Sequence, residues 1–182
     1  MTEAVPTLET ERLRLRPYHR ADFDAFAAHL ADPVSAAHIG VSDRETSWRR
    51  FTSHAGMWLI DGAGWWSVEL RENGQLVGNV GAFFRESTHA IEIGWNTYRD
   101  YWGHGYAREA AQAALGWAFD ARGEPRAHAL IAPGNASSIQ VATRLGMSLD
   151  GQTVSQGKAV DVYVIRRSGV ATPATGRSDA TP

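Results

Sequence analysis

Gly103 and Gly105 flank a histidine directly before a segment that has the spacing of a helix. At such a helix entrance the first N–H groups have no intrahelical acceptor, and the helix dipole adds partial positive charge. These groups can hold a phosphate or pyrophosphate, and the missing side chains let the ligand approach the main chain. The two glycines therefore predict a site for a phosphorylated cofactor, although a tight turn before a helix would use the same residues.

The residues around this loop narrow the choice of cofactor. A dinucleotide fingerprint needs a third glycine where Arg108 stands and an acidic residue about twenty positions later, and residues 130–133 offer none. The phosphate loop of nucleotide hydrolases needs Gly-Lys-Ser or Gly-Lys-Thr, and neither triplet occurs in the sequence. A cofactor whose pyrophosphate is held mostly by main chain remains, and coenzyme A fits that description. Another phosphate ligand, such as a nucleotide, stays open as an alternative.

Four segments in order carry a more specific signal: Glu-Ile-Gly-Trp at 92–95, Tyr-Trp-Gly-His-Gly-Tyr-Ala at 101–107, Asn-Ala-Ser-Ser at 135–138 and Arg-Leu-Gly-Met at 144–147. Together they resemble the GNAT superfamily of N-acetyltransferases. The opening Thr-Glu-Arg-Leu-Arg-Leu-Arg-Pro at 10–17 resembles its ribosomal-protein N-acetyltransferase (RimJ/RimL-type) branch, and the resemblance covers roughly residues 8–166. Trp102 departs from the superfamily, where Gln or Arg is commoner, but matches the branch.

The resemblance implies that acetyl-CoA is the acyl donor and that three stretches bind it. The strand end near Gly94 would also supply an N–H that polarises the thioester carbonyl. Asn135 would contact the amide arm of the cofactor, although its place also suits a helix cap. The implied cofactor-binding residues are Trp95, Asn96 and Thr97 beside the pantetheine arm, Gly103, His104, Gly105, Tyr106, Ala107 and Arg108 at the pyrophosphate, and Asn135 and Ser138.

Acetyl transfer to an amine needs a neutral amine, a stabilised oxyanion and a proton for the departing thiolate. Glu92 is the candidate general base, because a strand carboxylate could take the ammonium proton directly or through one water. It stands between two isoleucines, which favours a strand interior over an exposed edge, and there a carboxylate needs a role or a partner. His128 is a reserve candidate. Leu130 stands where some superfamily members carry a second glutamate.

The general acid is a separate question. Many superfamily members place a tyrosine seven positions after the asparagine, and Ala142 stands there instead. Ser138 matches the serine of the resembled branch and could hydrogen bond the thiolate, relaying a proton from water. Its alternative role is an ordinary helix-start hydroxyl that bonds the backbone.

We expect an acetyl-CoA-dependent N-acetyltransferase that moves an acetyl group to a primary amine by direct attack in a ternary complex. The amine could be a protein N-terminus, which the branch favours, an aminoglycoside-like or polyamine metabolite, or an amino acid derivative. A non-catalytic module that binds acyl-CoA as a sensor is the alternative. Trp48, Trp58, Trp65 and Trp66 could wall an acceptor pocket, but core packing explains most tryptophans.

The composition of the chain excludes several kinds of site and partner. The 182 residues suit one domain, and the absence of cysteine excludes a thiol nucleophile and thiolate metal sites. The net charge of −2 lacks the basic field of a nucleic-acid binder, and the seven histidines show no metal-site spacing. No signal peptide or membrane span is visible, so we expect a cytoplasmic protein without a metal and without nucleic acid or membrane as partners. A monomer and a homodimer both remain open.

The hydrophobic patterning predicts an α+β protein (α/β mixed), with both helices and strands along the chain. Alternation at 8–16 indicates a strand whose arginines form a solvated face. Further strands are predicted over 65–71, 75–84, 89–95, 126–131 and 158–166, and helices over 22–30, 44–60, after the glycine loop and over 135–145. The resemblance implies a GNAT-like twisted mixed, mostly antiparallel sheet of about seven strands flanked by helices and splayed between the fourth and fifth. We expect one acetyltransferase domain over 1–167 and a flexible polar tail over 168–182.

Overall fold

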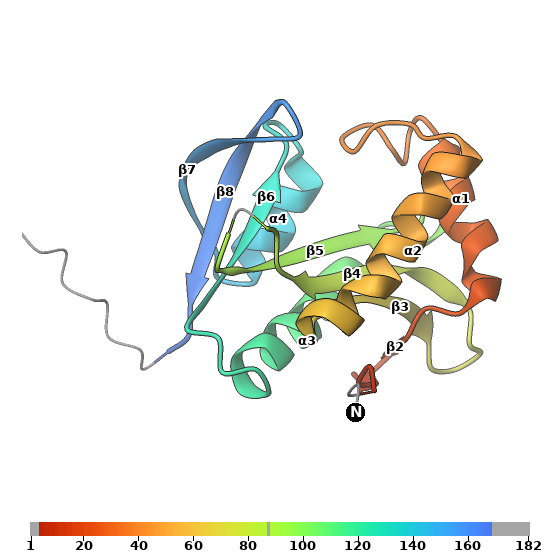
Figure 1. Cartoon of the computed structure of the whole chain (residues 1–182), viewed down its shortest axis with the longest axis horizontal. Helices are drawn as coiled ribbons and strands as arrows, with labels where there is room; N and C mark the ends of the chain where they lie inside the picture. The colour runs from red at the N-terminus through yellow and green to blue at the C-terminus, as the bar shows by residue number, and fades with distance from the viewer. Residues whose placement is uncertain (1–3, 87, 169–182) are drawn as a thin grey trace, which may run out of the picture.

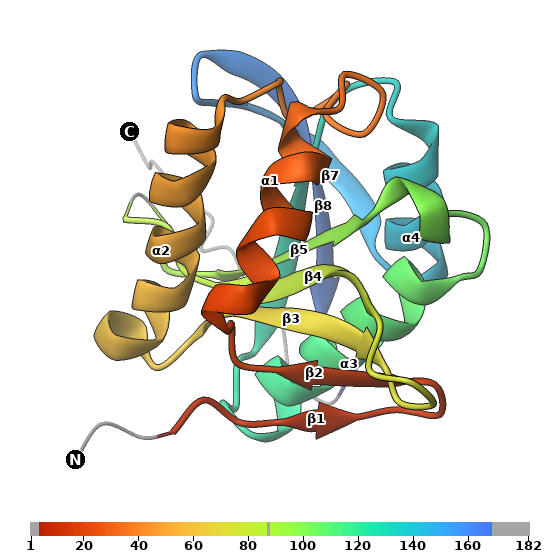
Figure 2. The ribbon, with the colours of Figure 1, turned by 90° about the vertical axis from the view of Figure 1, so that its right-hand side faces the viewer.

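A computed structural model describes residues 4–86 and 88–168, which form one mixed sheet with helices on both faces (Figures 1 and 2). The sheet has the strand order β1-β2-β3-β4-β5-β6-β8-β7. The strands are β1 (Leu8–Glu9), β2 (Leu13–Arg16), β3 (Gly64–Leu70), β4 (Leu76–Phe83), β5 (Ile91–Thr97), β6 (Arg126–Ile131), β7 (Ser148–Ser155) and β8 (Lys158–Arg166). The helices are α1 (Phe23–Ala31), α2 (Arg44–Asp61), α3 (Tyr106–Asp120) and α4 (Ala136–Arg144), with short 3-10 turns at Arg20–Asp22 and Arg99–Tyr101.

The mixed α+β class and the mostly antiparallel sheet are confirmed, with two differences from the predicted strands. The segment 8–16 is not one strand: it folds back on itself, so that Leu8 pairs with Leu15. The sheet also gains β7, whose residues are almost all exposed and show no apolar alternation, and which is held by its antiparallel pairing with β8. The predicted tail over 168–182 lies outside the described residues except for Ser168.

The sheet opens between β5 and β6. The antiparallel strands β4 and β5 pair over six residues, whereas the parallel strands β5 and β6 pair only at Ile91 with Ala127 and at Glu92 with His128. Figure 1 shows β6, β8 and β7 turned away from the other strands. If 8–16 is counted as one strand, this is the predicted splay between the fourth and fifth. Beyond Glu92, every second N–H and C=O of β5 therefore faces an unpaired edge.

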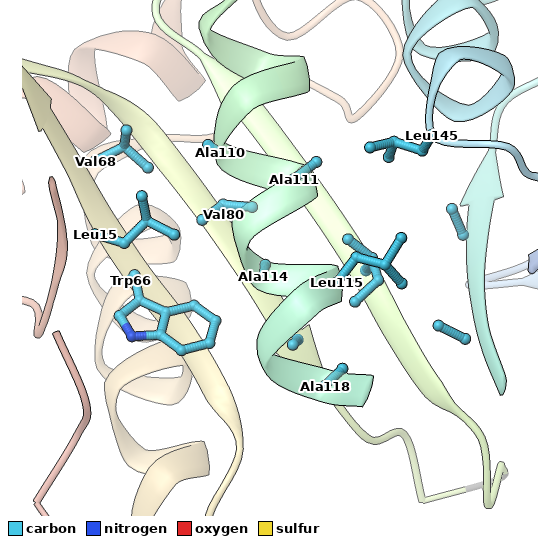
Figure 3. Packing of buried hydrophobic residues seen from close by; sticks show 14 of the residues in the cluster. Leu15, Trp66, Val68, Val80, Ala110, Ala111, Ala114, Leu115, Ala118 and Leu145 are labelled. Atoms are coloured by element: carbon cyan, nitrogen blue, oxygen red, sulfur yellow. The ribbon is translucent and has the colours of Figure 1, made fainter. Parts of the chain in front are cut away.

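Helix α3 covers one face of the sheet, and α1 and α2 cover the other (Figure 2). The small side chains of α3 let its backbone lie close to the strands, because four alanines bury themselves where longer residues would hold the helix away. Figure 3 shows this contact from close by. The buried residues there are Ala110, Ala111, Ala114, Leu115 and Ala118 of α3 against Leu15, Trp66, Val68 and Val80.

The arginines of β2 are not simply a solvated face. Arg16 is half-buried beneath the start of α1, where it bonds Asp22 at 2.8 Å and Glu69 at 2.6 Å. The alternation correctly separates the leucines from the arginines, but the α1 segment covers the polar side as well. Arg16, Asp22 and Glu69 therefore pair with one another on this face rather than with water.

Candidate active site

The glycine loop leads directly into α3, which begins at Tyr106. Gly103 and Gly105 have φ values of 81° and 78°, in the left-handed region that only glycine adopts readily. In the part of the chain that the structure describes, none of the six N–H groups from Gly103 to Arg108 donates a hydrogen bond within the protein. The first that does is that of Glu109, to the Gly105 carbonyl at 3.2 Å. These donors are available to an anion.

Arg12 binds the carbonyl side of this loop, a contact that the sequence did not predict. Its guanidinium donates to the His104 carbonyl at 3.0 Å, pairs with Glu109 at 2.6 Å and lies 4.8 Å from the centre of the Tyr106 ring. Binding the carbonyl leaves the N–H side of the loop open. No local sequence pattern predicts the contact between Arg12 and Glu109, which are 97 positions apart.

The predicted pantetheine stretch lies next to the first turn of α3. Trp95 and Thr97 line a small hollow together with Tyr106 and Ala107, so the structure brings two of the predicted cofactor segments to one place. The indole N–H of Trp102 donates to the Thr97 carbonyl at 2.7 Å. The Thr97 carbonyl therefore already has a donor within the protein.

Glu92 is buried, with 4% of its surface exposed, and it has a partner. Arg85 forms an ion pair with it through two hydrogen bonds, of which the one from Nη2 to Oε1 measures 2.8 Å. On the other side, Nε2 of His128 lies 3.6 Å from Oε2. Although burial raises the pKa of Glu92, His128 and Arg85 more than offset this effect and hold it below its ordinary value. Glu92 is therefore an ionised carboxylate at neutral pH.

Asn135 caps α4, as its alternative role predicted: its side-chain oxygen accepts from the Ser138 N–H at 3.2 Å. The Ser138 hydroxyl takes no part in the hydrogen bonds among the described residues, and its side chain is partly exposed. That hydroxyl is therefore free to bond a ligand, in contrast to the neighbouring Ser137, whose hydroxyl donates to Asn135.

An aromatic layer covers β5 on the face that carries Glu92. The Trp65 ring lies over Gly81 and Gly94, and His54 of α2 stacks on it with ring centres 4.4 Å apart and planes 5° apart. Trp58 and Trp66 are buried in the core, as core packing predicted, and Trp48 packs edge-on against Phe23. The four tryptophans therefore do not form the wall of one pocket.

Residues 12–148 match the family model described as an acetyltransferase (GNAT) domain. The chain belongs to this family and is an N-acetyltransferase. Within the described residues, no helix is both long and apolar enough to cross a membrane.

Known proteins are similar to this chain over nearly their whole length. The crystal structure of an acetyltransferase from Agrobacterium tumefaciens is 33% identical, with a TM-score of 0.83 over 92% of this chain and 98% of that one. The protein YkkB of Bacillus subtilis is 32% identical over 86% of this chain and 93% of its own. RimL, a ribosomal L7/L12 α-N-protein acetyltransferase solved in complex with coenzyme A, is 16% identical with a TM-score of 0.70 over 90% of this chain and 98% of that one, which shows a common fold.

Proposed function

We propose that this protein transfers the acetyl group of acetyl-CoA to a primary amine by direct attack in a ternary complex. One observation carries the proposal: six consecutive N–H groups, free of partners within the described chain, stand at the entrance of α3 beside an opened strand edge. A pyrophosphate matches such a row of donors, and an extended amide arm matches the edge of a strand. The coenzyme A complex of RimL, which has the same fold, supports this assignment.

Each part of the donor site has a proposed role. Residues Gly103 to Arg108 bind the pyrophosphate, and Trp95, Asn96 and Thr97 lie along the pantetheine arm, with Asn135 at its amides. An N–H of the β5 edge polarises the acetyl carbonyl. Losing a donor of this kind typically raises an activation barrier by about 2.7 to 4 kcal/mol.

Glu92 and Ser138 carry out the two proton transfers of the reaction. Glu92 accepts the ammonium proton through one water, and His128, 3.6 Å away, is placed to pass it on. Arg85 keeps the carboxylate ionised and fixed, which aids orientation but weakens it as a base. The free hydroxyl of Ser138 donates to the departing thiolate, for which a weak donor suffices.

The ion pair between Arg85 and Glu92 also supports the second candidate, a module that binds acyl-CoA without turnover. In that case Glu92 would be a structural partner of Arg85 and nothing more. The two functions make different demands on the protein, because only an enzyme consumes acetyl-CoA when an amine is added.

Thermal-shift measurements with acetyl-CoA, NAD and ATP test the ligand, and thiol release with a panel of amines tests the reaction. We expect stabilisation by acetyl-CoA and turnover with at least one amine. Stabilisation by NAD or ATP alone would contradict the donor site. Tight binding of acetyl-CoA without thiol release over a broad panel would favour the sensor.

A further inference from the structure

Arg50 of α2 is a half-buried cation without a carboxylate. Within the described residues, no Asp or Glu oxygen lies within 4.0 Å of its guanidinium nitrogens, and the guanidinium donates no hydrogen bond. The other half-buried arginines of this face differ: Arg16 pairs with Asp22, and Arg85 pairs with Glu92. Burial lowers the pKa of Arg50, but a guanidinium stays charged at any physiological pH. A charge held away from water needs a partner.

Arg50 stands one turn before His54 on α2, so the two side chains lie on the same face of that helix. Burial is the main cause that lowers the pKa of His29 to about 4 and of His54 to about 3, and Arg50 adds to the effect at both rings. His29 stacks on Tyr98, directly after β5, with ring centres 5.1 Å apart. His54 stacks on Trp65, which lies over Gly94. Because Arg50 shares a helix face with His54, its side chain extends toward the face of β5 that carries Gly94 and Glu92.

Other buried polar groups gather on the same face without partners. Among the described residues, both ring nitrogens of His29, the indole N–H of Trp65 and the side-chain amide nitrogen of Asn79 are buried and form no hydrogen bond. His29 and Trp65 are each 7% exposed. Such groups are rare in folded proteins, since each one left unmatched is destabilising. An indole N–H, an amide N–H and a neutral imidazole each carry a donor, so hydrogen-bond acceptors are in short supply on this face.

The nearby carboxylates do not neutralise Arg50. Glu92 is paired with Arg85, and Asp32 accepts from the Val34 N–H and the Ser35 hydroxyl and lies 3.4 Å from Arg99. Arg50 is therefore the half-buried cation of this face for which the described residues supply no carboxylate, and a polycationic amine would not supply one either.

We infer that the acceptor amine carries a carboxylate and that Arg50 binds this carboxylate while the amine faces Glu92. The inference rests on the proposed function, because it names the substrate class of the same reaction. Of the acceptors left open by the sequence, it selects amino acid derivatives over polyamines and aminoglycoside-like amines.

The test compares matched amines with the wild-type protein and with Arg50→Gln. Phenylalanine, methionine and glutamate are each paired with the α-amide, which has the same shape without the α-carboxylate charge. We expect Arg50→Gln to raise the KM for each amino acid by roughly ten- to a hundredfold while the KM for its amide stays within a factor of about three. Arg50→Lys should recover part of the loss. Arg49→Gln is the control, because Arg49 is exposed and pairs with Glu45 on the same helix.

Calorimetry provides a readout that needs no turnover. N-acetylphenylalanine and N-acetylphenylalaninamide are titrated into the protein saturated with coenzyme A, and the acid should bind at least about tenfold tighter, an advantage that Arg50→Gln abolishes. Equal binding of acid and amide, or an equal effect of Arg50→Gln on both, would overturn the inference. Turnover of spermidine in preference to every amino acid would overturn it and leave the acetyltransferase proposal intact. Absence of acetyl-CoA binding would instead contradict the proposed function.

Discussion

The ring of Trp65 lies so close over Gly94 that a Cβ atom added at Gly94 would stand 2.7 Å from Cη2 of the indole. The same ring covers Gly81 on the neighbouring strand, where an added Cβ would stand 2.6 Å from it. Glycine on β4 and β5 thus makes room for an indole that lies flat on the sheet and carries His54 on its other side. The face of β5 that carries Glu92 is therefore covered by a layer of rings.

Gly94→Ala should destabilise the protein, since the added methyl group forces the indole and the histidine above it to move. Overpacking of this kind typically costs about 1 to 3 kcal/mol of unfolding free energy. Chemical denaturation measures the loss. Trp65→Phe shortens the ring and should make Gly94→Ala less damaging in the double variant. Gly56→Ala, on α2 with nothing within 4 Å of the added Cβ, is the control and should be neutral or stabilising. Additive losses in the double variant would show that the two residues do not interact.

Gly105→Val should weaken acetyl-CoA binding strongly. Gly105 has a φ of 78°, so a β-branched residue must shift the turn and with it the row of free N–H groups. We expect the Kd for coenzyme A to rise at least about tenfold, measured by calorimetry. Gly116→Ala is the matched control, because Gly116 lies inside α3 with open space around it. Wild-type affinity in Gly105→Val would place the pyrophosphate elsewhere.

The elements that the sequence predicted best are those whose signal is local. The strands Arg126–Ile131 and Lys158–Arg166 have the predicted bounds, and a helix follows the glycine loop as predicted. In each case the residues that predict the element lie within the segment itself. β7 was missed because its stability comes from pairing with β8, and its exposed residues carry no pattern.

The charge partners of the site could not be predicted in the same way. The sequence indicated that Glu92 needs a role or a partner, but it could not name Arg85, which reaches Glu92 across the turn between β4 and β5. Arg12 and Arg50 are ordinary surface arginines by local pattern. The significance of Arg12 depends on its contact with the loop before α3, and that of Arg50 on the packing of α2 against the sheet. Both are properties of the tertiary structure alone.

Substitutions at Glu92 and Arg85 separate a base from a structural ion pair. Glu92→Gln should lower kcat by about 10² or more and flatten the rise of activity with pH, with little change in coenzyme A affinity. Arg85→Gln removes a group that lowers the pKa of Glu92, so that pKa rises. If Glu92 is the base, the acidic limb of the pH–rate profile then moves to higher pH. A profile that stays in place while stability falls would assign Glu92 a structural role only.

The buried histidines should make the protein sensitive to mild acid. In the folded state burial lowers the pKa of His29 from 6.5 to about 4, so the unfolded chain binds a proton first as the pH falls. The stabilising contribution is complete above pH 6.5 and is lost progressively between that value and about pH 4. Each pH unit within this window removes up to about 1.4 kcal/mol of unfolding free energy for one such group.

His29→Phe should remove part of this dependence, because phenylalanine can keep the stacking on Tyr98 and has no nitrogen to protonate. Denaturation curves at pH 7.5, 6 and 5 measure the slope, and the variant should lose less stability than the wild-type protein across this range. His54 remains in the variant and titrates in the same direction, so the slope should shrink without vanishing. Exposed His38 offers the control substitution His38→Gln, which should leave the slope unchanged. An identical slope in His29→Phe would show that the buried ring does not stay neutral in the folded protein.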